Sequence, residues 1–236
     1  MDDKLQIQPG TAQETLIIPL YARKKCGDKF PELYKDPAAA KICDRLDYDF
    51  SELDKKYDTA LYEFGALEGA MRQLDMMYEI NDYLNSHPNA SIVCLGCGLD
   101  LDPRKCGSQQ NKIFNVDFPD VIAMREELAG INPRETNIVS NLTNLSWMDQ
   151  VDARNGAVFY AAGVFHYLKK EDVKAIVLKM TELFPGCRLV FDTVGTLGYK
   201  LMMRAILKKH GMNDFGNLFY TNDAVKDLST WSDKTV

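Results

Sequence analysis

The sequence predicts an α/β fold in which a doubly wound, Rossmann-like, mostly parallel sheet follows an N-terminal helical cap. Apolar runs alternate with amphipathic stretches after residue 90, which is the pattern of right-handed βαβ units. One apolar run ends in the turn Gly96-x-Gly98, and Asp117 follows nineteen residues later at the end of the next run. A glycine turn after one strand and an acid after the next are typical of a sheet that binds a nucleoside.

The first part of the chain reads as helical. We expect residues 1–86 to form the helical cap and residues 87–236 the sheet domain. Apolar residues recur at helical spacing through 61–84, which predicts one long helix. Asn-Ser-His-Pro at 85–88 ends it. No strand pattern appears before residue 91, so we expect no strand in the cap.

After residue 90 the apolar runs predict five strands separated by helices. The expected strands are 92–95, 113–118, 136–142, 157–164 and 188–194. The expected helices are 119–128, 170–184 and 197–210. Phe219 and Tyr220 are expected to begin a sixth strand. The segment 230–236 resembles the start of another strand, so we expect a final strand to be missing.

The residues around the glycine turn favour one kind of nucleoside. Glycine lets a ligand approach the backbone, and an acid at the next strand tip can accept hydrogen bonds from a ribose diol. The third glycine of the dinucleotide fingerprint is absent, and Asp100, Asp102 and Pro103 stand where a pyrophosphate would need bare amides. The pattern therefore indicates a nucleoside that carries a cation, a description that S-adenosylmethionine fits.

Composition narrows the class of protein. The chain of 236 residues has 28 basic and 34 acidic side chains, a net charge of −6. This balance lacks the basic footprint of a nucleic-acid-binding protein. The sequence shows neither an apolar run of membrane-spanning length nor a signal peptide, so we expect no membrane association and a cytoplasmic location.

The six cysteines are expected to stay reduced in a cytosolic chain. Cys94 and Cys97 at CxxC spacing, with Cys106 nearby, could indicate a metal or redox cluster. No histidine pair at metal spacing accompanies them. We interpret Cys94 and Cys97 as small residues in tight spaces and predict no metal site.

Several segments in order resemble a known family. They are 18–23 (IPLYAR), 70–72 (AMR), 93–100 (VCLGCGLD), 115–121 (NVDFPDV), 161–168 (AAGVFHYL) and 189–192 (LVFD). The chain resembles class I S-adenosylmethionine-dependent methyltransferases of the leucine carboxyl methyltransferase family, in the bacterial branch of tetracenomycin-type polyketide O-methyltransferases. The resemblance covers nearly the whole chain and says little about the substrate.

The resemblance implies roles for individual positions. Arg72 would bind the carboxylate of the methionine half of the cofactor, with Arg23 near the same end. Asp117, with Phe118 beside it, would take the ribose, and Asn141 and Leu142 would meet the adenine. The residues expected along the methionine half are Gly96, Cys97, Gly98 and Asp100. The residues expected beside the transferable methyl group are Ala162, Gly163, His166 and Tyr167.

Two positions depart from the family pattern. The family usually has Asp where this chain has Asn141, and the carboxyl methyltransferases carry Glu where it has Ala162. The second departure favours a small-molecule acceptor over a protein carboxyl group. Each implied role also has a plain structural alternative: Asp117 could cap the following helix, and Arg72 could pair with Asp75 one turn away.

The sequence therefore predicts an S-adenosylmethionine-dependent O-methyltransferase that releases S-adenosylhomocysteine. A carboxylate acceptor needs no base, whereas a hydroxyl acceptor would benefit from His166, with Tyr167 as a further candidate. Asp192, at the end of the last expected strand, could also reach the site. Two alternatives are an NAD-dependent Rossmann oxidoreductase and a non-catalytic methyltransferase-like module. The oligomeric state and the acceptor are not predicted.

Overall fold

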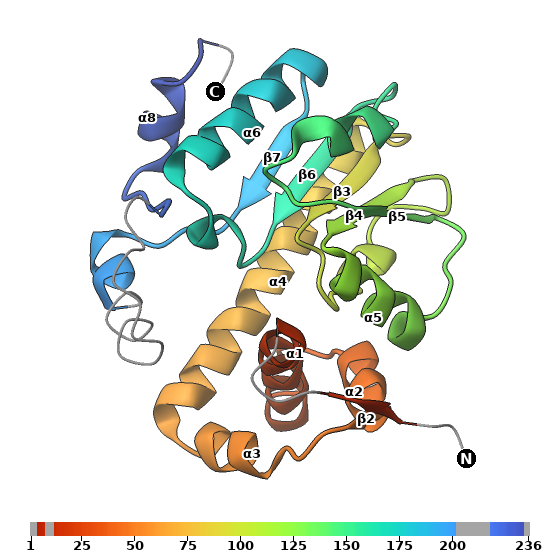
Figure 1. The fold of residues 1–236 in the computed structure, drawn as a ribbon, viewed down its shortest axis with the longest axis vertical. Helices are drawn as coiled ribbons and strands as arrows, with labels where there is room; N and C mark the ends of the chain where they lie inside the picture. The colour runs from red at the N-terminus through yellow and green to blue at the C-terminus, as the bar shows by residue number, and fades with distance from the viewer. Residues whose placement is uncertain (1–3, 8–11, 202–217, 234–236) are drawn as a thin grey trace.

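The computed structural model describes residues 4–7, 12–201 and 218–233. Its N-terminal part is a group of helices below a sheet (Figure 1). The elements of this part, in chain order, are β1 (Leu5–Gln6), α1 (Ala12–Lys29), α2 (Pro37–Asp44), β2 (Leu46–Asp47), α3 (Ser51–Tyr57) and α4 (Ala60–Ser86). Local chemistry starts α2, because the Asp36 side chain accepts from Ala39 N at 2.9 Å and Pro37 occupies the first turn.

A parallel sheet forms the second part. In the described residues its strand order is β5-β4-β3-β6-β7, and every neighbouring pair is parallel. The strands are β3 (Ser91–Leu95), β4 (Ile113–Asp117), β5 (Glu135–Val139), β6 (Ala157–Ala161) and β7 (Arg188–Phe191). The chain reverses its direction of winding between β3 and β6, so the two halves of the sheet diverge there. Open α/β sheets bind ligands at such a switch point.

Both faces of the sheet are covered, because side chains of each strand alternate between two cores. On one face Val93 and Leu95 join a cluster with α6 (Lys170–Leu183) and the 3-10 helix η2 (Leu145–Gln150). On the other face Ile92 and Cys94 pack with the end of α4 and with α5 (Pro119–Ala129). The predicted doubly wound α/β fold is therefore confirmed.

Helix α4 connects the two parts of the molecule (Figure 1). Its first half packs with α1 in the core of the N-terminal helices, and its second half contacts β6 and β7. A second link comes from Arg45, whose Nη1 donates to the carbonyls of Glu127 and Leu128 at the end of α5. Helix α4 thus contributes to both cores. The division of the chain at residue 86 stays a prediction.

The five predicted strands of the main sheet are present, but four of them end earlier than expected, β4 by a single residue. β5 ends at Val139, its last residue opposite β4, which ends at Asp117. β6 stops at Ala161 because the chain turns at Gly163, which has a φ of 72°. β7 then loses its neighbour after Phe191, which pairs with Ala161. In each case pairing stops where a neighbouring strand leaves the sheet.

Two further expectations about strands are wrong. The cap does contain strands, because β1 and β2 pair in parallel; at two residues each they are too short to show alternation. Phe219 and Tyr220 form no strand, since the contact there is one antiparallel bridge between Lys169 and Leu218. Instead a short helix, α8 (Ala224–Ser229), follows.

The end of the chain leaves some expectations unchecked. The expected helix 197–210 is helical over 196–201, and the rest of it lies outside the described residues, as do the last three residues of 230–236. Within the described ranges, the helices are all too short or too polar to cross a membrane.

Candidate functional site

A cavity of about 940 Å³ lies at the carboxyl ends of β3 and β6, where the winding of the sheet reverses. Helices α1 and α4 supply its other walls. It is lined by ten residues that the sequence placed in the site: Arg23, Arg72, Gly96, Cys97, Gly98, Asp100, Ala162, Gly163, His166 and Tyr167. The tertiary fold therefore brings together side chains from the cap and from two strand ends.

The floor of the cavity is the turn after β3. Gly96 and Gly98 have φ values of 67° and 46°, in the left-handed region that disfavours residues with a Cβ. A Cβ built on Gly96 would lie 2.7 Å from Cγ2 of Val164, in the loop after β6. The chain therefore passes Val164 closely here, and only glycine fits without a shift.

Asp117 stabilises this turn from the neighbouring strand. Its Oδ2 accepts a hydrogen bond from Gly98 N at 2.8 Å, and its Oδ1 accepts from Phe118 N at 2.8 Å. Burial raises the pKa of Asp117, and these two amide hydrogen bonds oppose the rise. The N-cap of α5 is Phe118 rather than Asp117. The carboxylate thus has a structural partner in the glycine turn, and the oxygen lone pairs not used by these amides could accept from a ribose.

Four predicted site residues do not line the cavity. Asp117 lies one hydrogen bond away from it through Gly98, whereas Phe118 is half exposed beside that carboxylate. Asn141 is exposed, and its Oδ1 accepts from Thr143 N within its own loop. Leu142 is buried in the sheet core. Their proposed contacts with ribose and adenine would lie along the edge of the cavity, at the ends of β4 and β5.

Arg72 projects from α4 to the ends of β6 and β7. Its Nη1 lies 2.9 Å from Oδ2 of Asp192, while Oδ1 of Asp192 accepts from Gly163 N at 2.6 Å. The guanidinium packs on Gly163, where a Cβ would lie 3.3 Å from Nη1. Nη1 therefore pairs with Asp192 and not with Asp75, the alternative that the sequence offered.

Arg23 is held in place by two contacts within the protein. Its Nε forms a buried ion pair with Asp36 at 2.9 Å, and its Nη2 lies 3.4 Å from Leu99 O. Burial alone would raise the pKa of Asp36, but the Arg23 guanidinium, the Ala39 N–H and Lys105 together hold the pKa below its usual value. Arg23 therefore joins the cap to the loop after the glycine turn, and it reaches the cavity from that position.

A buried group of acids lies behind this loop. Asp100 accepts from Tyr160 Oη at 3.2 Å and from Asp102 N at 2.9 Å. Tyr34 of the cap donates toward Asp102 Oδ2 at 3.3 Å. Burial and the neighbouring Asp100 carboxylate raise the pKa of Asp102 to about 6, against the opposing effect of Lys105. The Asp100 carboxylate lines the cavity and gives that wall a negative character.

His166 and Tyr167 belong to a short 3-10 helix, η3 (Phe165–Tyr167), directly after β6. The His166 Nδ1 atom is buried and has no hydrogen-bond partner, and the imidazole lies against the Tyr167 ring with centroids 4.3 Å apart. Burial lowers the pKa of His166; the Asp192 carboxylate raises it and the Arg72 guanidinium lowers it. A neutral imidazole in this position can take a proton from the hydroxyl group of a bound substrate.

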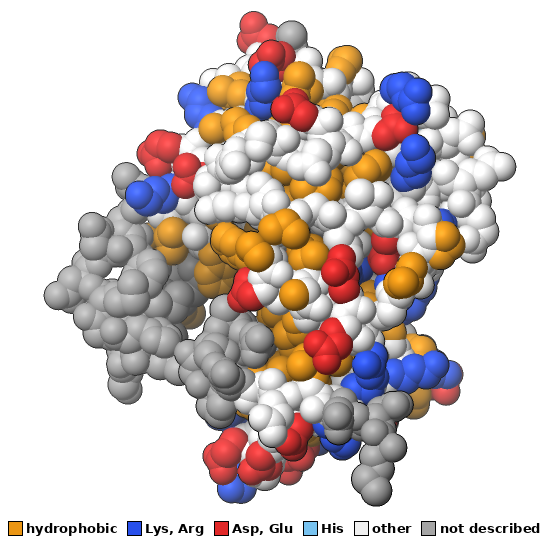
Figure 2. Space-filling view, turned by 45° about the vertical axis from the view of Figure 1, so that its right-hand side comes forward, with side chains coloured by type: hydrophobic (Ala, Val, Ile, Leu, Met, Phe, Trp, Pro, Cys, Tyr) orange, Lys and Arg blue, Asp and Glu red, His pale blue; other side chains and the backbone are white. Residues whose placement is uncertain are grey.

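Other lining residues were not anticipated as site residues. They come mainly from α1 and α4 and are largely apolar or aromatic: Leu16, Ile18, Pro19, Tyr57, Leu61 and Tyr62. Ile18, Leu61 and Tyr62 are exposed despite being large and hydrophobic. Their helical periodicity gave no sign of this, because the same spacing is expected of a helix packed in a core. Figure 2 shows hydrophobic side chains gathered across the middle of one face, between the sheet above and the N-terminal helices below.

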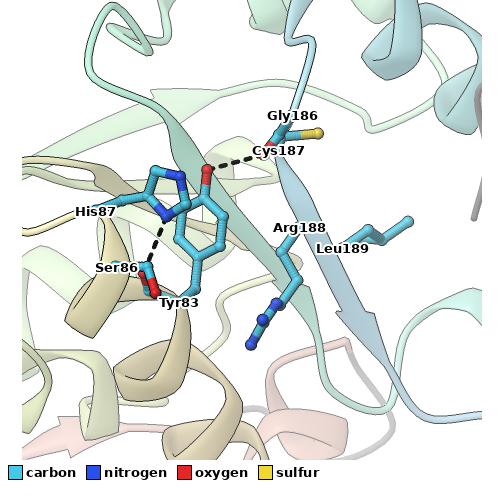
Figure 3. A pocket seen from close by; sticks show the side chains of 7 residues that line it. All are labelled: Tyr83, Ser86, His87, Gly186, Cys187, Arg188 and Leu189. Atoms are coloured by element: carbon cyan, nitrogen blue, oxygen red, sulfur yellow. Dashed lines mark hydrogen bonds between the residues drawn. The ribbon is translucent and has the colours of Figure 1, made fainter.

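A second hollow of about 360 Å³ lies at the opposite end of the sheet, between the end of α4 and the start of β7 (Figure 3). Tyr83 donates to Gly186 O at 3.0 Å and stacks on His87, with ring centroids 4.2 Å apart. Arg188 pairs there with Glu79 and Asp82. These contacts join helix to strand, and no residue predicted for the site lies among them.

The cysteines are all unpaired thiols, and Cys94, Cys97 and Cys106 are buried. Burial raises the pKa of the Cys97 thiol well above its ordinary value, which disfavours the thiolate that a metal needs. In the part of the chain that the structure describes, no group of three His, Cys, Asp or Glu side chains could hold a metal ion.

Two methyltransferases are similar to this chain in sequence. The tetracenomycin polyketide synthesis O-methyltransferase TcmP of Streptomyces glaucescens is 28% identical over 182 residues, which is 77% of this chain and 65% of that protein. The S-adenosyl-L-methionine-dependent methyltransferase dpfgK of Gibberella zeae is 24% identical over 217 residues, 85% of this chain and 72% of that protein. The chain is similar to S-adenosylmethionine-dependent methyltransferases. No protein-family model matches it.

Similarity to solved structures is weaker. An O-methyltransferase family protein from Burkholderia thailandensis has a TM-score of 0.46 and 17% identity, over 91% of this chain and 65% of that one. This likeness is distant. The expected resemblance to the tetracenomycin-type enzymes is confirmed, whereas the leucine carboxyl methyltransferase family remains a prediction. The chain matches just under two thirds of the length of the bacterial relative.

Proposed function

We propose that this chain is an S-adenosylmethionine-dependent O-methyltransferase that acts on a small molecule. The observation that carries the proposal is the cavity at the switch point between β3 and β6, which is lined by Arg72 and by the glycine turn that Asp117 holds. The similarity to two methyltransferases supports the same chemistry. S-adenosylhomocysteine would be the released product.

The proposed cofactor contacts follow the walls of the cavity. Arg72 would bind the carboxylate of the methionine half through its guanidinium, and Arg23 would add positive charge at that end. The backbone of the turn would line the methionine chain, with Asp100 facing its ammonium group. Asp117 would accept from the ribose hydroxyls. Asn141 would meet the adenine amino group through its side-chain oxygen, with Leu142 beside it and Phe118 next to the ribose.

The chain's own part in the reaction would be positioning. The sulfonium of S-adenosylmethionine supplies an electrophilic methyl group, so the protein needs to hold the acceptor oxygen in line with it. Ala162 and Gly163 line the cavity at the end of β6 without bulky side chains and leave room for the acceptor. Helices α1 and α4 would exclude water from the site.

The acceptor would be an apolar molecule carrying a hydroxyl or a carboxylate. The lining from α1 and α4 is mostly apolar, which suits a small hydrophobic substrate. The bacterial relative is an O-methyltransferase of tetracenomycin polyketide synthesis. For a hydroxyl acceptor, His166 would take the proton as the oxygen attacks, and Tyr167 would contact the substrate. Neither nucleic acid nor a membrane is part of this proposal, and we expect a cytoplasmic location.

Binding measurements test the proposal against its alternatives. Calorimetry should show that S-adenosylmethionine and S-adenosylhomocysteine bind and that NAD does not. The reason is that Asp100 and Asp102 follow the turn where an NAD pyrophosphate would lie, and a third glycine is absent. NAD binding without S-adenosylmethionine binding would establish an oxidoreductase instead.

A radiolabelled methyl-transfer screen over hydroxylated and carboxylated apolar compounds tests catalysis itself. Transfer to any of them, abolished when S-adenosylmethionine is replaced by S-adenosylhomocysteine, is the expected result. Cofactor binding with no transfer across the screen would favour the non-catalytic methyltransferase-like module.

A further inference from the structure

Arg72 uses only part of its guanidinium within the protein. Its Nη1 pairs with Asp192, whereas its Nε is buried and has no hydrogen-bond partner. Among the described residues, Nη2 also donates no hydrogen bond. Nε and Nη2 form the edge of a guanidinium that grips a carboxylate with two parallel bonds. The arginine is thus held at one corner, and its Nε–Nη2 edge is left without a partner in the protein.

Asp192 is itself fixed in place at the end of β7. One of its oxygens accepts from the backbone N–H of Gly163 at 2.6 Å, so the carboxylate cannot rotate without losing that bond. The other oxygen holds Arg72 at 2.9 Å. The arginine and the acid are 120 residues apart in the sequence, on α4 and after β7. Their side chains are only 24% and 23% exposed, so solvent screens the pair less than a surface pair.

Gly163 completes this arrangement. Its Cβ position lies 3.3 to 3.6 Å from three atoms of the Arg72 guanidinium, so the planar group rests directly on the backbone at the end of β6. Two contacts with independent origins, one electrostatic and one of packing, therefore fix the guanidinium at the wall of the cavity. A side chain with several rotatable bonds would otherwise lose conformational freedom when it bound a ligand.

We propose that Asp192 is the positioning residue of the cofactor site, holding Arg72 by one corner so that its Nε–Nη2 edge is presented to the carboxylate of S-adenosylmethionine. This inference rests on the proposed function. It assigns to Asp192 a role that acts through Arg72, with no contact to the cofactor of its own.

The experiment uses two ligands, one with the amino-acid end of the cofactor and one without it. S-adenosylhomocysteine carries the amino-acid carboxylate, and 5′-methylthioadenosine keeps the nucleoside and the thioether without it. Their dissociation constants are measured by calorimetry for the full chain and for Asp192→Asn. Asparagine can still accept from Gly163 N, but its NH₂ group faces a donor on Arg72 and cannot pair with it.

The expected result is selective. Asp192→Asn should weaken S-adenosylhomocysteine by about 10- to 100-fold, the range for hydrogen bonds to charged groups, and should leave methylthioadenosine within about twofold. In an Arg72→Ala background the same change should have no further effect on S-adenosylhomocysteine, because the two residues act as one unit. Asp75→Asn, an exposed acid one turn from Arg72, serves as the matched control and should bind both ligands as the unaltered chain does.

Other outcomes would overturn the inference. Equal loss of both ligands would mean that Asp192 only supports the fold, and no loss of either would mean that Arg72 needs no positioning. A full effect in the Arg72→Ala background would show that Asp192 acts by another route. Should Asp192→Asn fail to fold, Asp192→Glu, which keeps the charge but displaces it, carries the same comparison and the same expectation. If the unaltered chain binds neither nucleoside, the proposed function itself fails.

Discussion

The carboxylate of Asp117 accepts a hydrogen bond from the backbone N–H of Gly98 at 2.8 Å. This contact joins the end of β4 to the turn after β3, at the floor of the cavity. A residue expected from the sequence to bind a ribose thus also stabilises the backbone to which the methionine half of the cofactor would bind. In the proposed site, ligand binding and local backbone geometry would therefore be coupled through this one side chain.

Asp117→Asn should lower both cofactor affinity and stability. An amide side chain offers one acceptor oxygen where the carboxylate offers two, so one of the two backbone N–H groups loses its partner. We expect binding of S-adenosylhomocysteine to weaken by about 1.5–3 kcal/mol and unfolding to become easier by ~1 kcal/mol. Calorimetry and urea denaturation measure the two effects. Asp149→Asn, at an exposed position on η2, should change neither. An unchanged affinity with reduced stability would confine Asp117 to a structural role.

Gly96→Ala should destabilise the protein more than Gly186→Ala does. Both glycines have a positive φ, 67° and 78°, so alanine suffers backbone strain of about 1–2 kcal/mol at each. Only Gly96 has a neighbour in the way, since its Cβ would lie 2.7 Å from Val164 Cγ2, whereas nothing lies within 4 Å at Gly186. Urea denaturation measures the difference, which we expect to be about 1–3 kcal/mol. Val164→Ala combined with Gly96→Ala should recover part of it, and equal losses at the two glycines would contradict the close approach.

Asp102→Asn should stabilise the protein more at neutral pH than at acidic pH. The pKa of Asp102 is raised from 3.8 to about 6 by burial and by Asp100, so between these values the folded protein binds more protons than the unfolded chain. Stability of the unaltered chain therefore falls as the pH rises through this window. Asparagine does not ionise, so its advantage should grow to about 1–3 kcal/mol by pH 7. Thermal unfolding at a series of pH values measures it. An advantage that does not change with pH would show that Asp102 is ionised throughout.

His166→Gln should separate the two classes of acceptor. If a hydroxyl is methylated, the unaltered enzyme should lose activity as the pH falls through the pKa of His166, which burial places below 6.5. In the variant that pH dependence should disappear and the rate should fall by about 10²–10⁴-fold. A carboxylate acceptor, which needs no base, should be methylated equally well by both proteins. Steady-state methyl transfer over pH measures this, with His87→Gln as the control at the far end of the sheet. Full activity of His166→Gln on a hydroxyl acceptor would exclude the imidazole as the base.

The strands of the main sheet could be predicted because their signals are local. The run before Gly96 is apolar on both faces of its strand, which only a doubly covered sheet explains, and the two cores that receive Ile92 and Val93 confirm it. The glycine turn was predictable for the same reason, since glycine adopts a positive φ at no steric cost. Asp117 was found from its spacing after that turn.

Pairings between distant segments could not be predicted in this way. For Arg72 the sequence offered Asp75 as a neighbour, but the helix exposes Asp75 to solvent and turns Arg72 toward Asp192, far along the chain. The strands β1 and β2 were missed because each is two residues long and exists only through its partner. Short strands and buried ion pairs depend on which surfaces meet when the domain folds.

The sequence by itself determined the five strands of the main sheet, the glycine turn and the acid at the next strand tip, because periodicity, positive φ and strand ends are encoded over a few residues. Only the tertiary structure decided which charged groups meet. Arg72 is held by Asp192, Arg23 by Asp36, and Asp117 by the amide of Gly98. Such choices depend on the distance and burial of groups on different elements, because the strength of an electrostatic contact is set by the space and solvent around it and not by separation along the chain.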